Sequence, residues 1–418
     1  MESVAQKWTR SYSGTDEDVI VALSEAVAEI AAKPVQTRKR DLWRAHNSLK
    51  DVGVPVYIRA IAARETINPY LQCRDPLLRS FEAQLRRFVL QDWLCDDYII
   101  EPWLKMQAVH QLPPDGGWGV PTGRAHQNAE SGAFDIDPPI KELDDVKRLV
   151  EPAHRIDEAA TAERYERVAP LLRGLTLAVS RKPWWTNWHG DVSTDLAYLR
   201  GVEQMMWDMM DYPDWLHSLL GFMRDGVLKT HREAEEAGHW RLGDHENQSM
   251  PYAEELEDPR PESPPVRRQD LWLFIASQET GTVSPAMFDE FMLRYQIPIA
   301  EHFGLVAYGC CEDLTRKIDV LRKIPNLRRI AVTPFADVPR CAEQIGTDYV
   351  SSYRPSPAEM VAYGYDDALV RRTLRDAHRA FRANGCEYDV CLKDVETVQG
   401  DPTRLKRFVQ AVRDETAG

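Results

Sequence analysis

The sequence predicts an α/β protein whose core is a (β/α)8 TIM barrel, with extra helices at the N-terminus. The first observation is alternation: through the second half of the chain, helical segments separate short apolar runs of β-forming residues. Such alternation is typical of βαβ units that build a parallel sheet. The second observation is that the apolar runs of the whole chain amount to eight candidate strands, the number of a closed barrel. A doubly wound open sheet is the rival architecture.

The N-terminal part is predicted to be helical. Thr15 and Asp18 have a spacing like that of a capping box, and the residues that follow them are apolar at helical spacing. A second amphipathic helix is expected over 78–94. We therefore divide the chain into an N-terminal helical extension, residues 1–50, and a barrel domain, residues 51–418.

The elements of the barrel follow from the apolar runs and from the residues between them. Ser284-Pro285 and Ser356-Pro357 each place a capping serine before a proline at the first helical position. Two proline-rich stretches are expected to be long loops: 111–140, of the kind that serves a function, and 250–268, which we expect to be exposed. The candidate strands are 54–60, 98–100, 174–179, 271–276, 305–310, 329–333, 348–352 and 387–392, and the candidate helices after the third strand are 195–210, 214–237, 285–303, 313–324, 338–345, 357–383 and 402–414.

Composition excludes several classes of protein. The 418 residues include 66 Asp and Glu against 52 Lys and Arg, a net charge of −14, which argues against binding to nucleic acid or to an anionic membrane. No run approaches the roughly 20 apolar residues of a spanning helix, and the polar start is unlike a signal peptide. Seven cysteines are too few, and odd in number, for a disulfide framework. We expect a cytoplasmic enzyme with free thiols.

Polar residues follow the predicted strands where a barrel places its active site, at the carboxyl ends. Thiols, carboxylates and an imidazole that converge there are the ligands of a zinc site. Each also has a plainer interpretation: a cysteine at a strand end is often a buried apolar residue, and neighbours on a strand point to opposite faces, so at most one of Cys310 and Cys311 faces a common site. The residues in question are Gln278 and Glu279, Cys310, Cys311 and Glu312, Tyr353 and Arg354, Cys391, Lys393 and Asp394, and a loop with Trp184, Trp185, Trp188, His189 and Asp191.

Three segments carry a resemblance to a known family. Val202–Leu219, Tyr308–Leu314 and Leu392–Pro402 are similar to segments of the uroporphyrinogen decarboxylase-like superfamily, over roughly residues 170–415. The resemblance implies a (β/α)8 barrel and one of two activities, decarboxylation or zinc-dependent methyl transfer with corrinoid proteins. The substrate loop with which the true decarboxylases begin, similar to Arg-Gln-Ala-Gly-Arg, is absent from this sequence, which disfavours tetrapyrrole decarboxylation.

The resemblance also implies metal ligands. The methyltransferases hold zinc with a His-x-Cys at one strand end and a later cysteine. Here Tyr308-Gly309-Cys310 falls on the His-x-Cys, with tyrosine in the place of histidine, and Cys391 lies near the later cysteine. The resemblance thus suggests zinc bound by Cys310 and Cys391, with Glu279 as a substitute for the missing histidine.

The function we expect is transfer of a methyl group from a small methylated or methoxylated substrate to a thiol or to a corrinoid on a separate protein. A decarboxylase or other lyase acting on a carboxylated small molecule in the same barrel mouth is the alternative, and a non-catalytic binding barrel is a third. A homodimer is a further expectation. The assigned residues are Glu279, Tyr308 and Asp394 for catalysis; Trp188, His189, Asp191, Gln278, Tyr353, Arg354 and Lys393 for substrate binding; and Glu279, Cys310 and Cys391 for the metal.

Overall fold

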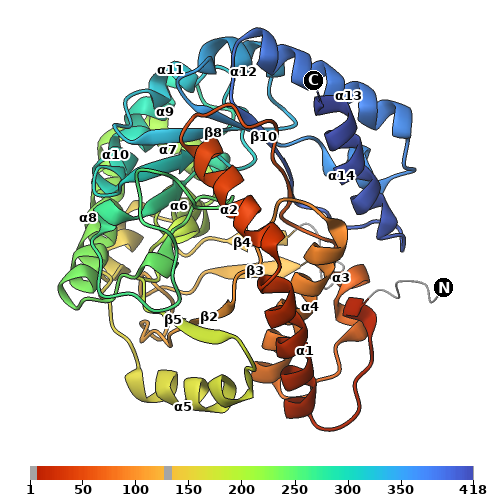
Figure 1. Cartoon of the computed structure of the whole chain (residues 1–418). Coiled ribbons are helices and arrows are strands. Elements are labelled where there is room, and N and C mark those ends of the chain that lie inside the picture. The colour runs from red at the N-terminus through yellow and green to blue at the C-terminus, as the bar shows by residue number, and fades with distance from the viewer. Residues whose placement is uncertain (1–6, 127–133, 418) are drawn as a thin grey trace.

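The computed structural model describes residues 7–126 and 134–417, and it shows an α/β protein built on parallel strands (Figure 1). Six strands form one parallel sheet in the order β1-β10-β9-β8-β7-β6, and β2 pairs with β5 in a second parallel sheet. Strand bounds are β1 Val56–Ile58, β2 Trp103–Gln107, β5 Thr176–Ser180, β6 Trp272–Ile275, β7 Leu305–Tyr308, β8 Leu327–Val332, β9 Val350–Tyr353 and β10 Tyr388–Leu392.

Parallel strands that alternate with helices confirm the predicted fold class, whereas a closed barrel is not demonstrated. Among the described residues no ladder joins β1 to β2 or β5 to β6. Irregular segments occupy these two edges instead. The amide of Asp97 donates to the carbonyl of Val56 and the Asp96 carboxylate accepts from the amide of Ile58, while the amide of Glu246 donates to the carbonyl of Trp272. The sheets are therefore separate along both edges.

All but one of the predicted strands are present. The exception is 98–100, where the chain is irregular because Asp96 and Asp97 hold it against β1; the strand lies later, at β2. Within β2, Leu104 and Met106 enter the core beneath the helices, so Lys105 faces the opposite side.

Helices surround the strands in a ring (Figure 1). The predicted capping box is confirmed: Asp18 accepts from the Thr15 amide, and Thr15 accepts from the Asp18 amide. The helix bounds are α1 Asp16–Ala31, α2 Pro34–Asn47, α3 Ala63–Thr66, α4 Pro76–Leu94, α5 Glu158–Val168, α6 Ser193–Arg200, α7 Val202–Asp211, α8 Pro213–Glu236, α9 Pro285–Phe288, α10 Arg294–Ala300, α11 Ile318–Leu321, α12 Val338–Ile345, α13 Asp367–Ala383 and α14 Thr403–Thr416.

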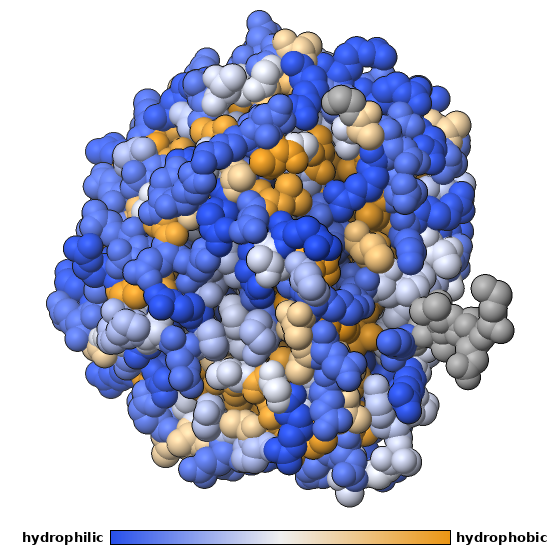
Figure 2. Space-filling view, in the orientation of Figure 1, coloured by the Kyte–Doolittle hydropathy of each residue, from blue (hydrophilic) through white to orange (hydrophobic). Residues whose placement is uncertain are grey.

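Helix α2 covers the end of the large sheet where its strands begin, and it crosses the centre of the face seen in Figure 1. His46 is hydrogen-bonded to Asp389 of β10, and Asn47 accepts from Arg329 of β8. Figure 2 shows this face as largely hydrophilic.

The loop predicted over 250–268 is exposed only in part, so that expectation was wrong for its first residues. Met250, Tyr252 and Ala253 are buried, and Met250 and Tyr252 pack with Trp43 and Cys391 inside the sheet. Exposure becomes common only from residue 254 onward.

The other long loop, predicted over 111–140, contains an antiparallel hairpin that the sequence did not reveal. Its strands are β3 Gly123–His126 and β4 Phe134–Asp137, and the residues between them lie outside the described ranges. Across the described part of the chain, no helix has both the length and the apolar character needed to cross a bilayer.

Candidate active site

Two thiols and an ammonium group meet where β7 and β10 end. The Lys393 Nζ atom lies 2.7 Å from Cys310 Sγ and 3.5 Å from Cys311 Sγ, and the two sulfurs are 3.4 Å apart. Lys393 and Cys310 are buried, while Cys311 is partly exposed. Asp394 Oδ2 lies 3.2 Å from Lys393 Nζ and 3.7 Å from Cys311 Sγ. The carboxyl ends of these strands thus hold a pair of thiols beside Lys393, which is itself paired with Asp394.

Both cysteines face this site, although strand alternation predicted that at most one would. The reason is the turn after β7. Gly309 has a φ of +99°, a conformation that side chains rarely adopt, and a Cβ there would lie 2.7 Å from the Leu314 side chain. Alternation therefore ends at Tyr308, and the turn that begins at Gly309 places both Cys310 and Cys311.

Two buried side chains fix this turn. Arg354 donates from Nη1 to the carbonyl oxygens of Gly309 and Cys310, at 3.0 and 2.7 Å. Glu312 accepts from the amides of Cys310 and Ser277, at 2.8 and 3.0 Å, and so ties the end of β7 to the end of β6. The sulfur of Cys310 is consequently held by its own backbone and by Lys393.

The site favours a thiolate on Cys310. The hydrogen bond from Cys311, helped by the charges of Lys393 and Arg354, lowers the pKa of Cys310 to about 6 against the opposing effect of burial. The same hydrogen bond raises the pKa of Cys311, so that one thiolate and one thiol share the site. Burial works to lower the pKa of Lys393, and the nearby Cys310 and Asp394 charges outweigh it, so Lys393 is a cation.

The three residues expected to bind zinc are not brought into one group. Cys391 packs with Trp43, Tyr57 and Met250, and burial raises the pKa of its thiol to about 11. Among the described residues no set of three His, Cys, Asp or Glu side chains is arranged to hold a metal ion. Because the ammonium group of Lys393 already lies against the Cys310 sulfur, these donors do not fit zinc as arranged.

Glu279 belongs to a polar cluster at the end of β6. Its two carboxylate oxygens accept from Ser193 and Thr194, at 2.8 and 3.1 Å, and Gln278 lies 3.2 Å from it. Asp191 is fully buried and accepts from the amide of Thr194; burial, and next the charge of Glu279, raise the pKa of Asp191 well above its usual range. Asp191 therefore accepts at the first turn of α6 and holds its proton more tightly than an ordinary aspartate does.

Tyr308 and Tyr353 are not brought to the mouth. Tyr308 donates to Gln296 of α10 at 2.8 Å and packs edge-on against Phe288. Tyr353 packs against Phe381 of α13. Both side chains lie on the helix-facing side of the sheet, in the large apolar core.

His189 lies in a cleft of about 430 Å³ at the ends of β2 and β5, whose lining includes Trp184, Trp188 and Lys182. His189 Nδ1 is 2.8 Å from Asp195, and the Trp184 ring stacks on the imidazole with centroids 4.8 Å apart. Trp188 connects this cleft with the thiols, since it packs against Phe274 in the same apolar cluster as Cys310 and Cys311. Of the three tryptophans in this loop, Trp188 is therefore the one that shares an apolar cluster with the thiol pair.

Sequence reasoning missed two kinds of residue. Glu312 was noted without a role, because its two amide partners are fixed by tertiary structure. Arg59 and Lys105 are absent from the predicted site. For Lys105 a signal was available: it lies between the apolar residues Leu104 and Met106, and strand alternation places it on the opposite face from them.

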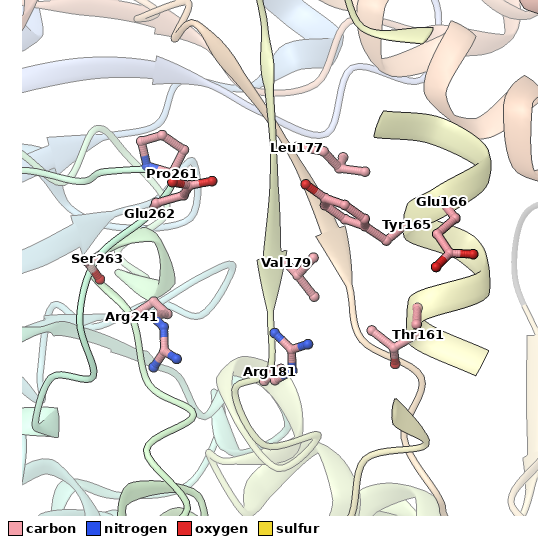
Figure 3. Close-up of a pocket in the computed structure, with 11 residues that line it drawn as sticks. Thr161, Tyr165, Glu166, Leu177, Val179, Arg181, Arg241, Pro261, Glu262 and Ser263 are labelled. Atoms are coloured by element: carbon pink, nitrogen blue, oxygen red, sulfur yellow. The ribbon is translucent and has the colours of Figure 1, made fainter. Parts of the chain in front are cut away.

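A further groove of about 380 Å³, between α5, β5 and the loop at 261–263, is lined by none of the predicted residues (Figure 3).

Comparison with known proteins identifies the fold and not the family. No protein-family model matches the chain, and no curated protein matches it in sequence. Among solved structures the chain is similar to a methyltransferase from Methanosarcina mazei, with a TM-score of 0.53 and 11% sequence identity, over 90% of this chain and 98% of that one. At this identity the likeness concerns the fold.

Proposed function

We propose that this protein is an enzyme that transfers a methyl group from a small methylated or methoxylated molecule to a thiol or corrinoid acceptor. The observation that carries the proposal is the sulfur of Cys310, 2.7 Å from the ammonium nitrogen of Lys393, in a site that lowers the pKa of this thiol. A thiolate is the nucleophile that displaces a group from a methyl carbon. The methyltransferase of similar fold supports the same class of reaction.

The first step is a displacement at the methyl carbon. A lone pair of Cys310 Sγ forms the S–C bond while the bond between the methyl carbon and the donor oxygen or nitrogen breaks, and that atom keeps the electron pair. Lys393 and Arg354 are the cations that stabilise an oxyanion leaving at this point. In a second displacement the acceptor takes the methyl group, and the electron pair of the S–C bond returns to Cys310.

The apolar part of the donor is proposed to bind in the cleft of Trp184, Trp188 and His189. Its aromatic lining excludes water from the reacting atoms and suits a flat or methylated molecule. His189, oriented by Asp195, is a base within the same lining.

Zinc and a corrinoid on a separate protein are additional proposals. A zinc ion shared by Cys310, Cys391 and Glu279 would require Lys393 to leave the Cys310 sulfur and Cys391 to lose its proton. Metal analysis of the purified protein tests this directly. Zinc that is retained by the wild type and lost in Cys310→Ser supports the metal site, and no retained zinc rejects it.

Mass spectrometry of the intact protein tests the proposed function. We expect incubation with a panel of methoxylated aromatics and methylamines, without acceptor, to add one methyl group to Cys310. Cys310→Ser removes this product, and Cys95→Ser, a change at an exposed free cysteine, is the matched control. Absence of any methylated Cys310 with every donor would overturn the assignment.

A lyase is the second candidate, and one observation favours it. Arg354 is buried, and in the described structure its guanidinium donates to carbonyl oxygens and not to a carboxylate. Arg354 and Lys393 together are suited to stabilise a carbanion formed from a carboxylated substrate. Release of carbon dioxide without methylation of Cys310 would favour this alternative.

A further inference from the structure

Three cationic side chains line the gap between β1 and β2, where the two sheets do not join. Arg59 follows β1, Arg87 lies on α4, and Lys105 lies in β2. In the part of the chain that the structure describes, none of the three makes an ion pair or a hydrogen bond with a carboxylate. The Nη2 of Arg87 donates to the carbonyl of Arg59, and its Nε is buried without a partner.

These residues line two adjoining cavities. One, of about 360 Å³, is lined by Arg87, Tyr98, Lys105 and Tyr252 among others. The second, of about 630 Å³, has Arg59 and Arg87 in its lining. Gln84 and Arg87 belong to both linings, so the cavities meet at Arg87. Solvent reaches all three cations: Lys105 is exposed, and both arginines are partly exposed.

The carboxylates nearby are already engaged. Glu101 accepts from Arg40 and from Tyr252, and Glu246 is paired with Lys182. Asp97 is paired with Arg413. Glu396 is the acidic residue in the lining of the larger cavity, and it is exposed. Against the effect of burial, the charges of Lys182, Lys105 and Arg59 all act to lower the pKa of Glu246, so this one carboxylate is shared among three cations. A bound anion would offset the positive charge that remains.

The gap is also connected to the thiol site. The β1–β10 register pairs Tyr57 with Cys391 and Ile58 with Leu392, so Arg59 and Lys393 are the first residues past the ends of these adjacent strands. The amide of Arg59 donates to the carbonyl of Leu392 at 2.9 Å. Tyr57 and Cys391 pack together inside the sheet, and alternation places Arg59 and Lys393 on that same side.

We propose that this cationic gap, formed by Arg59, Arg87 and Lys105, binds an oxyanion group of the substrate, a carboxylate or a phosphate, whose remaining part extends toward Cys310. The second half of this statement rests on the proposed function. Arginine and lysine are the side chains that recognise both oxyanions. Arg59, beside Lys393, is the residue at which the gap and the thiol site meet.

Isothermal titration with two probes, succinate and inorganic phosphate, tests the proposal, with the uncharged succinamide for comparison. We expect the full-length protein to bind one of the anions and not succinamide. Binding of succinate alone identifies a carboxylate group, and binding of phosphate alone identifies a phosphate group. Binding of neither anion overturns the proposal.

Variants locate the anion. Lys105→Met and Arg59→Gln are expected to weaken binding by about tenfold or more, which corresponds to the loss of one charged hydrogen bond. Lys147→Met, at an exposed lysine that lies outside the linings of both cavities, is the matched change of charge and should bind as the wild type does. An equal loss of affinity in Lys147→Met would overturn the assignment.

Cys310→Ser separates this inference from the proposed function. The serine variant should keep the wild-type affinity for the anion, because Cys310 is not among the three cations. If the anion binds in the gap while no donor methylates Cys310, the anion site is supported and the proposed reaction fails. If Cys310 is methylated while neither anion binds, the anion site fails and the proposed reaction is supported.

Discussion

The ammonium nitrogen of Lys393 lies 2.7 Å from the sulfur of Cys310, across 83 residues of sequence. The contact joins the end of β10, the last strand along the chain, to the turn that follows β7. After the larger effect of the hydrogen bond from Cys311, this contact also lowers the pKa of the Cys310 thiol, because a cation at this distance stabilises a thiolate.

Alkylation of Cys310 by iodoacetamide should follow the fraction of thiolate. With a pKa of about 6, the thiolate is present above that pH and is lost as the pH falls through it. Lys393→Met should move the midpoint of the rate–pH profile upward, since the cation is removed. Peptide mass mapping measures the rate at Cys310 alone. An unchanged midpoint in Lys393→Met would show that the cation does not control this thiol.

Glu312→Gln should destabilise the protein by about 1–3 kcal/mol, because one of two buried amides loses an acceptor. Urea unfolding measures the change. Glu359→Gln, at an exposed glutamate, is the control for loss of a charge. We also expect slower alkylation of Cys310 in Glu312→Gln, since the turn that places the sulfur loosens. Equal stability of both variants would refute a positioning role for Glu312.

Asp191→Asn should change how stability depends on pH. The raised pKa of Asp191 means that the folded protein binds this proton more tightly than the unfolded chain does. The wild type therefore loses stability as the pH rises above the ordinary aspartate pKa, whereas the asparagine variant does not lose it through this group. Urea unfolding at pH 5 and pH 8 should show the variant gaining relative to the wild type at the higher pH. Asp137→Asn, at an exposed position, should show no such gain.

Tyr308→Phe and Tyr353→Phe test whether either phenol acts in the reaction. Both side chains face the helices, so we expect methyl transfer to Cys310 to continue in both variants. Tyr308→Phe should cost about 1 kcal/mol of stability through its hydrogen bond to Gln296. A loss of Cys310 methylation in a variant that unfolds like the wild type would place that phenol in the reaction.

Features that depend on neighbouring residues could be predicted from the sequence, and features that depend on residues far apart in the chain could not. The capping box of Thr15 and Asp18 involves residues three apart, and sequence was sufficient to find it. The strand expected at 98–100 was misplaced because Asp96 bonds to an amide 38 residues earlier, which no local pattern encodes. Likewise, the position of polar residues just after a predicted strand was enough to select Cys310 and Lys393. Tyr308 and Tyr353 are the last residues of their strands, and which side of the sheet each faces depends on where the strand ends.

Helix α2 has a consequence for the order in which the chain assembles. His46 bonds to Asp389, 343 residues later, and Asn47 bonds to Arg329. During synthesis the N-terminal helices leave the ribosome long before either partner exists. The last turn of the helix therefore docks late, whereas Lys39 and Trp43 bond to the carbonyls of Tyr98 and Asp97, which are synthesised early. A nascent chain halted before residue 389 would carry this last turn undocked and accessible to protease, and release of the full chain would protect it.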